Sequence, residues 1–354
     1  MARHKRRSSK VGLPPGSLVH LGDRKTDHPA ISLMEFDAGE LVETRFPDLA
    51  RAQAYRPRLP KLWLNVHGLH EPEVMAEIGS RFHLHPLVLE DILNTDQRPK
   101  VDDYGDYLYI VARFFDYDAA GMALSSEQVS IILGRNFVLT FQERPTGSFD
   151  PIRDRLRQDR GQIRRLGTDY LAYSLLDTLV DRYFTVLEQI GERTEALEDE
   201  LLSQARAGQL QVLHQLKRDT LALRRAVWPL REVVNTLARA DTAFFQPDTL
   251  PYLRDVYDHT VHLIESLEGI RDLIAGLLDV YLSAISNRVN QEVRVLTVIA
   301  VIFMPATLIS GIFGMNFKAM PWLDLPQGFY LALAAMGSVA VTLATLFWRR
   351  KWLQ

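Results

Sequence analysis

The sequence predicts an amino-terminal α/β domain, a long helical stalk and two membrane-spanning helices at the carboxyl end. Three observations support this α+β membrane architecture. Strand-like and helical patterns are mixed in the first part of the chain, whereas only helical periodicity follows residue 168. Near the carboxyl end, residues 295–313 and 329–348 contain no charged side chain. About 20 apolar residues are enough to cross the hydrocarbon layer of a bilayer.

Composition excludes several classes of function. The 354 residues have a net charge of −3, so no overall positive field points to nucleic acid. The chain has no cysteine, which removes disulfides, thiolate metal sites and cysteine nucleophiles. The basic residues among the first ten accompany no apolar run, so we expect a disordered basic tail instead of a targeting signal. No nucleotide-binding loop or catalytic motif is present, and we predict neither an enzyme nor a nucleotide-binding protein.

The first predicted domain covers residues 1–167, on the cytoplasmic side. Runs of β-branched and aromatic residues indicate strands, and Gly134 and Arg135 separate the last two, which suits a two-residue hairpin turn. Amphipathic stretches between the first two strands indicate short helices. The expected strands are residues 62–66, 107–114, 127–133 and 136–141, and the expected helices are 72–82 and 85–93.

Residues 168–248 are predicted to form a helical hairpin. Apolar residues recur every three or four positions in 170–201 and 210–238, with charges between them. Gly208 lies in the connection, where a helix is expected to end.

A third helix is predicted within residues 249–313. It opens at Pro251, and no convincing stop signal precedes Gly311. A helix of this length would extend roughly 90 Å. We therefore expect it to project from the domain and continue into the first membrane segment.

The charged flanks predict the orientation of the membrane segments. The connecting loop, residues 314–328, offers only Lys318 and Asp324, whereas basic residues precede the first segment and follow the second, residues 329–348. The positive-inside rule therefore puts the loop outside and both termini, including the tail 349–354, in the cytoplasm. We expect the protein in the plasma (cell inner) membrane. The flanking basic residues are Arg288, Arg294, Arg349, Arg350 and Lys351.

One stripe along the long helix is made of small or polar residues. Flanking positions are bulky and apolar, which is the reverse of a packed coiled-coil seam. Such a stripe suits helices from several copies arranged around water. A close-packing face of small residues is the alternative. The stripe, in steps of four and three, is Asp279, Ser283, Ser286, Asn290, Val293, Thr297, Ala300, Met304, Thr307, Gly311 and Gly314.

The tripeptide Gly314-Met315-Asn316 follows the first membrane segment. Alone it is a weak signal, but after the penultimate of two carboxyl-terminal membrane segments it is specific. With these residues the chain strongly resembles the CorA family of magnesium and cobalt transport proteins. The resemblance covers essentially the whole chain, including residues 12–16, 85–94, 97–100, 228–232, 254–259 and 349–352.

The resemblance implies a funnel-shaped homopentamer that takes up Mg²⁺, and also Co²⁺ or Ni²⁺, driven by the membrane potential. Gly314, Met315 and Asn316 would hold the hydrated cation through neutral oxygen atoms. Below them the stripe would line the pore. We expect an Asn290 ring near the inner end, a constriction at Val293 and Leu296 or at Met304, a cytoplasmic carboxylate ring at Asp279, and pore-lining Thr307 and Gly311.

The resemblance also implies that Mg²⁺ bound between cytoplasmic domains closes the channel. The matching residues are Asp91 and Asp255 from neighbouring subunits, with Glu90 and Asp177 as a second tier. Hard oxygen ligands suit magnesium. For each acid a solvated surface position is the alternative. His259, one turn beyond Asp255, can coordinate a softer metal, but we expect a structural role for it.

One departure and two alternatives qualify this interpretation. Family members often place glutamates just after the Gly-Met-Asn motif, whereas this chain has Lys318. We therefore expect weaker attraction of cations at the mouth. The zinc-transporting branch of the same superfamily is one alternative function. A membrane-anchored sensor that conducts no ions is the other.

Overall fold

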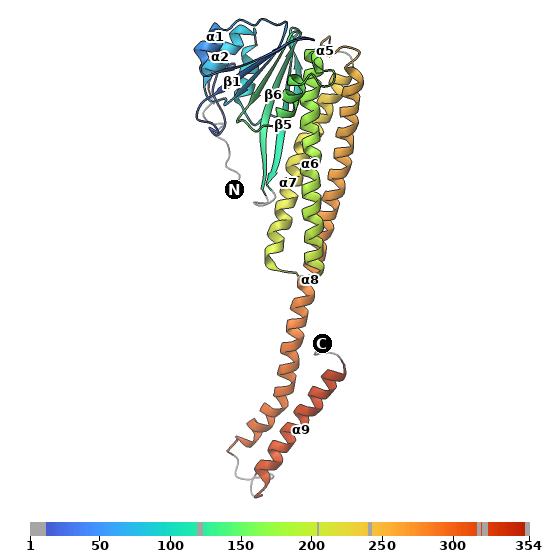
Figure 1. Cartoon of the computed structure of the whole chain (residues 1–354). Helices are drawn as coiled ribbons and strands as arrows, with labels where there is room; N and C mark the ends of the chain where they lie inside the picture. Colours follow the sequence, from blue (N-terminus) through green and yellow to red (C-terminus); the bar gives the residue numbers. More distant parts are fainter. Residues whose placement is uncertain are drawn as a thin grey trace. The chain divides into compact units, whose positions relative to one another are not determined.

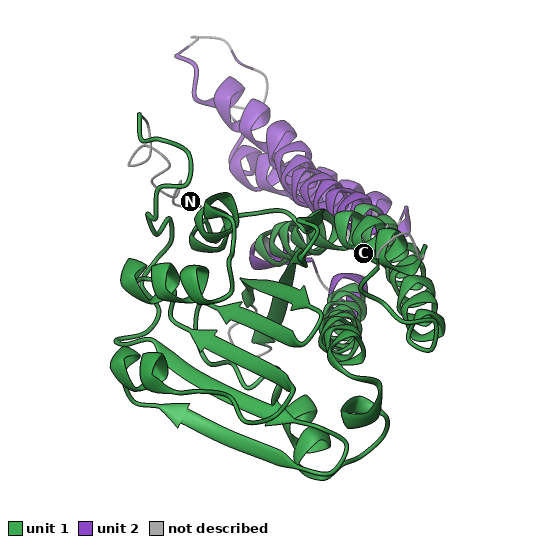
Figure 2. Ribbon diagram, turned by 90° about the horizontal axis from the view of Figure 1, so that it is seen from above, with its two compact units in different colours: residues 1–198, 211–275 green, residues 199–210, 276–354 purple. Residues whose placement is uncertain are grey.

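The computed structural model describes residues 12–118, 123–203, 205–239, 243–316, 320 and 325–350. The predicted basic tail, Lys318, Asp324 and Lys351 lie outside these residues. The chain divides into two compact units (Figure 2). Unit 1 consists of residues 1–198 and 211–275, and unit 2 consists of residues 199–210 and 276–354.

Unit 1 is built on one seven-stranded sheet with the order β2-β1-β3-β7-β6-β5-β4 (Figure 1). Only β3 and β7 run parallel, and the other neighbours in this sheet are antiparallel. The strands are β1 (Ala30–Phe36), β2 (Leu41–Phe46), β3 (Lys61–His67), β4 (Lys100–Asp103), β5 (Tyr107–Asp118), β6 (Ala123–Gly134) and β7 (Phe137–Gln142).

The four predicted strands are present as β3, β5, β6 and β7, whereas the sequence analysis did not predict β1, β2 and β4. The predicted two-residue connection is present but lies one residue later than expected. β6 ends at Gly134 and β7 begins at Phe137, so Arg135 and Asn136 connect them. Gly134 is needed for packing there, because a Cβ atom would lie 2.3 Å from the Phe137 ring.

One face of the sheet carries the main hydrophobic core. The helices α2 (Pro72–Arg81) and α3 (Pro86–Leu93) bury their apolar faces against it, including Val74, Met75 and Val88. Both helices have a proline in the first turn, where its missing N–H costs no helical hydrogen bond. The short α1 (Leu49–Ala54) packs partly buried residues at the edge of this core.

The opposite side of β3 is covered by α4 (Asp150–Arg157), which precedes the short α5 (Ile163–Leu166). Ile152 and Leu156 of α4 are fully buried. The Trp63 ring meets the Phe149 ring edge-on at 6.2 Å, and its indole N–H donates to Thr140 Oγ1 at 2.9 Å. Because side chains alternate along β3, this strand contributes buried residues to both faces of the sheet.

Long helices form the rest of the described chain: α6 (Thr168–Ser203), α7 (Ala207–Ala238) and α8 (Leu250–Phe313). The starts of α6 and α8 are joined by one carboxylate. Asp169 Oδ2 accepts from Thr249 Oγ1 at 2.7 Å and from the Gln246 backbone N–H at 3.0 Å. This carboxylate therefore fixes where α8 begins.

Two helices are long and apolar enough to cross a membrane: α8 and α9 (Gly328–Arg349). The 64 residues of α8 correspond to about 96 Å, slightly more than predicted. The most apolar window of each helix is only 6% buried within the single chain. The predicted fold class, an α/β domain followed by a long helix and two apolar carboxyl-terminal helices, is confirmed.

Candidate ion pathway and metal-binding residues

The predicted small and polar stripe lies entirely on the exposed surface of α8. Every stripe residue from Asp279 to Gly311 is exposed, and Gly314 is exposed just beyond the helix end. Tyr281, two positions from Asp279, is buried. The stripe therefore remains free in one chain, as it must be if other copies are to complete a pathway.

The two threonine hydroxyls of the stripe are available as hydrogen-bond acceptors. Thr297 Oγ1 donates to the Val293 carbonyl at 2.8 Å, and Thr307 Oγ1 donates to the Phe303 carbonyl at 2.9 Å. Each hydroxyl proton is used within the helix, so the remaining lone pairs point outward. A hydrated cation, whose waters donate hydrogen bonds, is matched by such oxygen atoms.

The Gly-Met-Asn tripeptide lies at the carboxyl end of α8. The Gly314 N–H donates to the Ser310 carbonyl at 2.9 Å, which closes one last α-helical turn. A Cβ atom on Gly314 would lie 3.3 Å from that same carbonyl oxygen, so a side chain would crowd the helix end. Asn316 follows, exposed, and the described part of the chain gives its side chain no hydrogen-bond partner.

The candidate constrictions are also exposed. Val293, Leu296 and Met304 expose 56%, 68% and 68% of their surface. In water such exposure would be costly, at about 25 cal/mol per Å² of apolar surface. A hollow of about 550 Å³ follows the outer half of this surface and includes Met304, Thr307 and Gly311. Neighbouring copies or lipid must cover the apolar members.

In unit 1, Asp91 is already paired within its own chain. Its Oδ2 lies 2.8 Å from Lys100 Nζ, and its Oδ1 accepts from Gln97 Nε2 at 2.7 Å. Burial opposes the charge of Lys100, but hydrogen bonds with Asp102 and Asp91 outweigh burial and raise the pKa of Lys100. A metal ion at Asp91 therefore has to share this carboxylate with Lys100 or displace it.

Glu90 of α3, a predicted second-tier ligand, accepts a hydrogen bond from the backbone N–H of Gly16. This contact fastens the amino-terminal segment to α3. Gly16 has a φ of +84°, which favours glycine, and a Cβ atom there would meet the Pro86 side chain at 2.8 Å. Glu90 thus has a clear structural role in the single chain.

The predicted Asp255 and Asp177 lie on α8 and α6, where a compact ligand set forms. Ligand atoms of Asp177, Asp181 and His259 all lie within 4.8 Å of one another. Asp255 Oδ2 lies beside this group, 3.9 Å from His259 Nε2, and 67% of the Asp255 side chain is accessible. Two carboxylates and one imidazole are a plausible donor set for a divalent ion.

Electrostatics support the same grouping. Burial and, to a smaller extent, the charge of the neighbouring Asp181 raise the pKa of the Asp177 carboxyl to about 6. Arg155 and His259 oppose the shift, and Asp255 adds to it. The sequence analysis placed Asp177 in the second tier of regulatory ligands, did not single out Asp181, and favoured a structural role for His259. The three residues share one site because α6 and α8 pack together.

The sequence analysis also missed Lys100 and Gln97 as partners of Asp91. The sequence offered one indication of these partners: residues 97–100 belong to the stretches that carry the family resemblance. A single chain does not test whether Asp91 of one subunit meets Asp255 of another. That pairing stays a prediction.

Comparison with known proteins identifies the family. The sequence-family model that describes CorA-like Mg²⁺ transporter proteins matches residues 61–351. The cobalt/magnesium transport protein CorA of Thermotoga maritima is 46% identical over 349 residues, covering 99% of both chains. The solved structure of the CorA magnesium transporter from Methanocaldococcus jannaschii superposes with a TM-score of 0.76 at 21% identity, covering 91% of this chain and 98% of that one.

A more distant relative is the zinc transport protein ZntB of Yersinia pseudotuberculosis, 23% identical over 82% of this chain and 88% of its own. Relatives of this chain thus include a protein named for zinc transport, the alternative function considered above. The family model spans most of this sequence, and the Thermotoga protein matches it along nearly its whole length. The chain therefore belongs to the CorA family of Mg²⁺ transporter proteins.

Proposed function

We propose that several copies of this chain, five by the family resemblance, surround a pore that conducts Mg²⁺, and also Co²⁺, into the cell. The observation that carries the proposal is the exposed stripe of α8, which continues from Asp279 to the Gly-Met-Asn end. Membership of a transporter family also supports the prediction that the protein is not an enzyme. The cobalt/magnesium name of the Thermotoga relative supports this choice of ions.

The outer end of the pore suits a hydrated magnesium ion. Magnesium releases its waters slowly, so a fast site should hold the hydrated ion. Asn316 and the carbonyl groups at the helix end offer neutral oxygens, which bind weakly enough for the ion to leave. A doubly charged ion gains about 4.6 kcal/mol per 100 mV of membrane potential. Electrical driving is sufficient without nucleotide hydrolysis.

Side chains in the interior of the pore would select the ion and gate its passage. Asn290 would form a second polar ring, with Val293, Leu296 and Met304 as apolar constrictions between the polar rings. Asp279 would add five carboxylates at the cytoplasmic end. Such apolar rings can close a pore by excluding water.

Closure by intracellular Mg²⁺ is proposed to act through the acidic residues of unit 1. Asp255 is exposed and available to a neighbouring subunit, whereas Asp91 is held by Lys100 and Gln97. A bound Mg²⁺ would bridge carboxylates that repel one another without it. Loss of the ion at low internal Mg²⁺ would then release the interface and open the channel.

The test is Mg²⁺ uptake by purified protein in liposomes at a range of internal Mg²⁺ concentrations. The wild type should slow as internal Mg²⁺ rises, whereas the Asp255→Ala variant should stay open. Asp272→Ala is a matched control, because Asp272 is an exposed acid of the same helix outside the regulatory set. It should behave like the wild type.

The same liposomes separate the two alternatives. Zinc flux without magnesium flux would overturn the magnesium assignment in favour of zinc transport. No flux of any divalent ion, with an intact oligomer, would indicate a non-conducting sensor.

A further inference from the structure

A cavity of about 400 Å³ lies in unit 1, far along the sequence from the residues of the ion pathway. Its walls come from the antiparallel pair β1 and β2, the end of β3, the loop after β7, and α4. The polar side chains among its lining residues are Ser32, Glu43, Arg45, His67, Asp150 and Arg153. Its volume falls in the range of cavities that bind small molecules.

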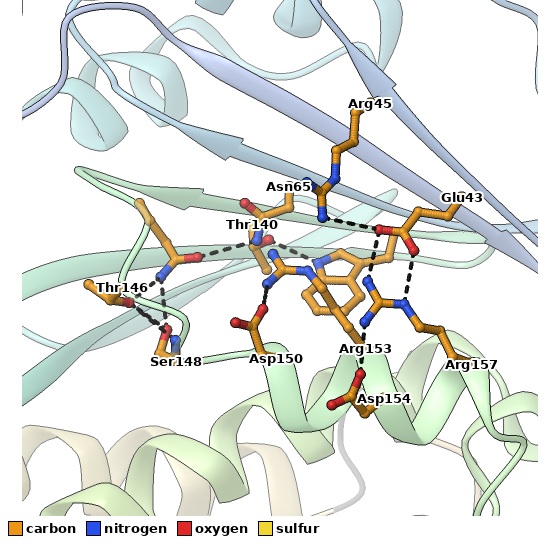
Figure 3. A network of polar contacts seen from close by, with 12 residues as sticks. Glu43, Arg45, Asn65, Thr140, Thr146, Ser148, Asp150, Arg153, Asp154 and Arg157 are labelled. Carbon is orange, nitrogen blue, oxygen red and sulfur yellow. Dashed lines mark hydrogen bonds and ion pairs between the residues drawn. The ribbon is translucent and has the colours of Figure 1, made fainter.

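Arg153 is held firmly in the wall of this cavity. Its guanidinium lies over the Trp63 ring at 5.2 Å, and its Nη1 donates to Asp150 Oδ1 at 2.5 Å (Figure 3). Only 12% of the Arg153 side chain is exposed, whereas its counter-charge Asp150 is 62% exposed. A mostly buried cation thus faces a carboxylate that water screens strongly.

The second carboxylate of the cavity is neutralised by an arginine outside the cavity lining. Arg157 donates to both oxygens of Glu43, at 2.9 and 3.0 Å (Figure 3). Arg45 lies 3.8 Å from Glu43, outside hydrogen-bonding distance, and 79% of its side chain is exposed. Arg157 also donates to Asp154 Oδ1 at 2.8 Å, so the three arginines of this network face three carboxylates. Among the described residues, Arg45 is the arginine of the three that makes no hydrogen bond with a carboxylate, so its guanidinium is available to a ligand.

Two titratable groups on different walls indicate a positive field. Burial and, to a smaller extent, the charge of Arg153 lower the pKa of the His67 imidazole to about 4, and the effect of Arg153 is larger than the opposing effect of Asp150. Hydrogen bonding from Arg157 lowers the pKa of Glu43, and the charges of Arg157, Arg45 and Arg153 act in the same direction. His67 is therefore neutral at physiological pH and can donate a hydrogen bond.

We propose that this cavity binds a small phosphate-bearing anion, held by Arg45 and Arg153 with Ser32 and His67 as neutral partners. Planar guanidinium groups match phosphate oxygens in pairs. The volume leaves room for an organic remainder beside one phosphate group. A nucleic acid does not fit this proposal, because the cavity is bounded on several sides and the chain carries no overall positive charge.

The site does not depend on the proposed ion pathway. Its lining residues all belong to unit 1, and binding can be measured without any transport. Failure of the transport proposal would therefore leave this proposal standing, and the reverse also holds.

Isothermal titration calorimetry of the full-length protein in detergent, with EDTA to remove divalent ions, tests the proposal. The probes are inorganic phosphate, adenosine monophosphate and succinate. Phosphate or the monophosphate should bind, and succinate should bind at least tenfold more weakly. Tighter binding of the monophosphate would identify a phosphate ester, whereas equal binding would identify free phosphate as the ligand.

Three variants assign the binding to the cavity. Arg45→Gln should weaken binding about tenfold or more, the loss expected for one charge-assisted hydrogen bond. Arg153→Lys keeps the charge but loses the planar fork, and it should also weaken binding. Arg51→Gln, an exposed arginine of α1 outside the cavity lining, should bind like the wild type.

Three results would overturn the proposal. The first is that neither phosphate probe gives a heat of binding at 10 mM. The second is that succinate binds as tightly as phosphate. The third is that the Arg45→Gln and Arg51→Gln substitutions weaken binding equally. Thermal unfolding of each variant in the absence of ligand checks that the fold is retained. Because Arg45 is exposed, its replacement should leave the unfolding temperature within about a degree of the wild type.

Discussion

The two halves of α8 differ in how much of their surface the chain itself covers. From Leu253 to Tyr281 buried residues recur at intervals of three or four positions, apart from one gap of seven between Leu267 and Ile274. After Tyr281, Val298 is the one buried residue of this fully described helix. The apolar character nevertheless rises toward the carboxyl end.

The difference shows which part of the molecule is complete in one copy. The first half of α8 satisfies the ordinary rule that an amphipathic helix buries its apolar stripe. The second half cannot, because its apolar residues have no partners in the chain. Lipid and further copies must supply these partners, so substitutions in the two halves should affect different measurements.

The largest effect is expected at the outer end of the second half. Asn316→Ala should reduce Mg²⁺ uptake into liposomes by about 100-fold or more, because a ring of amide oxygens would be lost at once from every copy. Unit 1 should unfold as in the wild type, since Asn316 lies outside it. Asn287→Ala, an exposed asparagine of α8 that is not on the stripe, should retain uptake.

The next largest effect is on stability, and it compares the two halves of α8 directly. Leu263→Ala should lower the free energy of unfolding of unit 1 by about 2–5 kcal/mol, because the side chain is only 1% exposed. Leu296→Ala, 68% exposed in the single chain, should leave unit 1 unchanged and instead raise Mg²⁺ leak at high internal Mg²⁺. Calorimetric unfolding and liposome flux measure the two outcomes. Equal destabilisation by both substitutions would remove the distinction.

A pH-dependent effect is expected at Asp219 of α7, which is 5% exposed. Gln215 Nε2 donates to Oδ1 at 2.8 Å, whereas the described residues offer Oδ2 no partner. Burial raises the pKa of Asp219 to about 6, above its ordinary value. The folded state therefore prefers the protonated acid, and this contribution is present at low pH and lost as the pH rises through 6.

Replacing this carboxyl should remove the cost. Ionisation of Asp219 at pH 8 costs up to about 3 kcal/mol, so Asp219→Asn should unfold at a higher temperature than the wild type at pH 8. The advantage should shrink at pH 5, where the wild type is mostly protonated. Asp106→Asn, at an exposed position, should show no such dependence on pH. An advantage of equal size at both pH values would contradict the role of ionisation.

The smallest effect concerns Asp255 in the first half. Without divalent ions, Asp255→Asn should change the stability of unit 1 by less than about 0.5 kcal/mol, because the pair with His259 is long and exposed. Adding Mg²⁺ should raise the unfolding temperature of the wild type more than that of the variant. A large loss of stability in EDTA would mean that Asp255 is structural.

Sequence patterns predicted the elements whose signal is local. Long apolar periodicity predicted α6 to α9, and dense β-branched runs predicted β3, β5, β6 and β7. The missed strands lack such runs: β2 is a half-exposed edge strand, and β4 has only four residues. The two-residue turn was placed one residue too early, because packing against Phe137, and not turn geometry, requires the glycine at position 134.

Site residues show the same division. The exposed stripe of α8 follows from one helix and could be predicted from its period. The partners of Asp91 and the group around Asp177 come from segments far apart in sequence, and tertiary packing alone brings them together. The cavity beside Arg153 belongs to this second class, because four separate segments build it.

The packed first half of α8, up to Tyr281, acts mechanically as a clamp on the rest of the helix. The 32 residues after it, 282–313, form a rod about 48 Å long, and a rod held at one end amplifies small rotations. A tilt of 5° about Tyr281 would carry the opposite tip sideways by about 4 Å. Rotations too small to disturb the packing of the clamp would therefore become displacements large enough to widen or seal a channel at the far end.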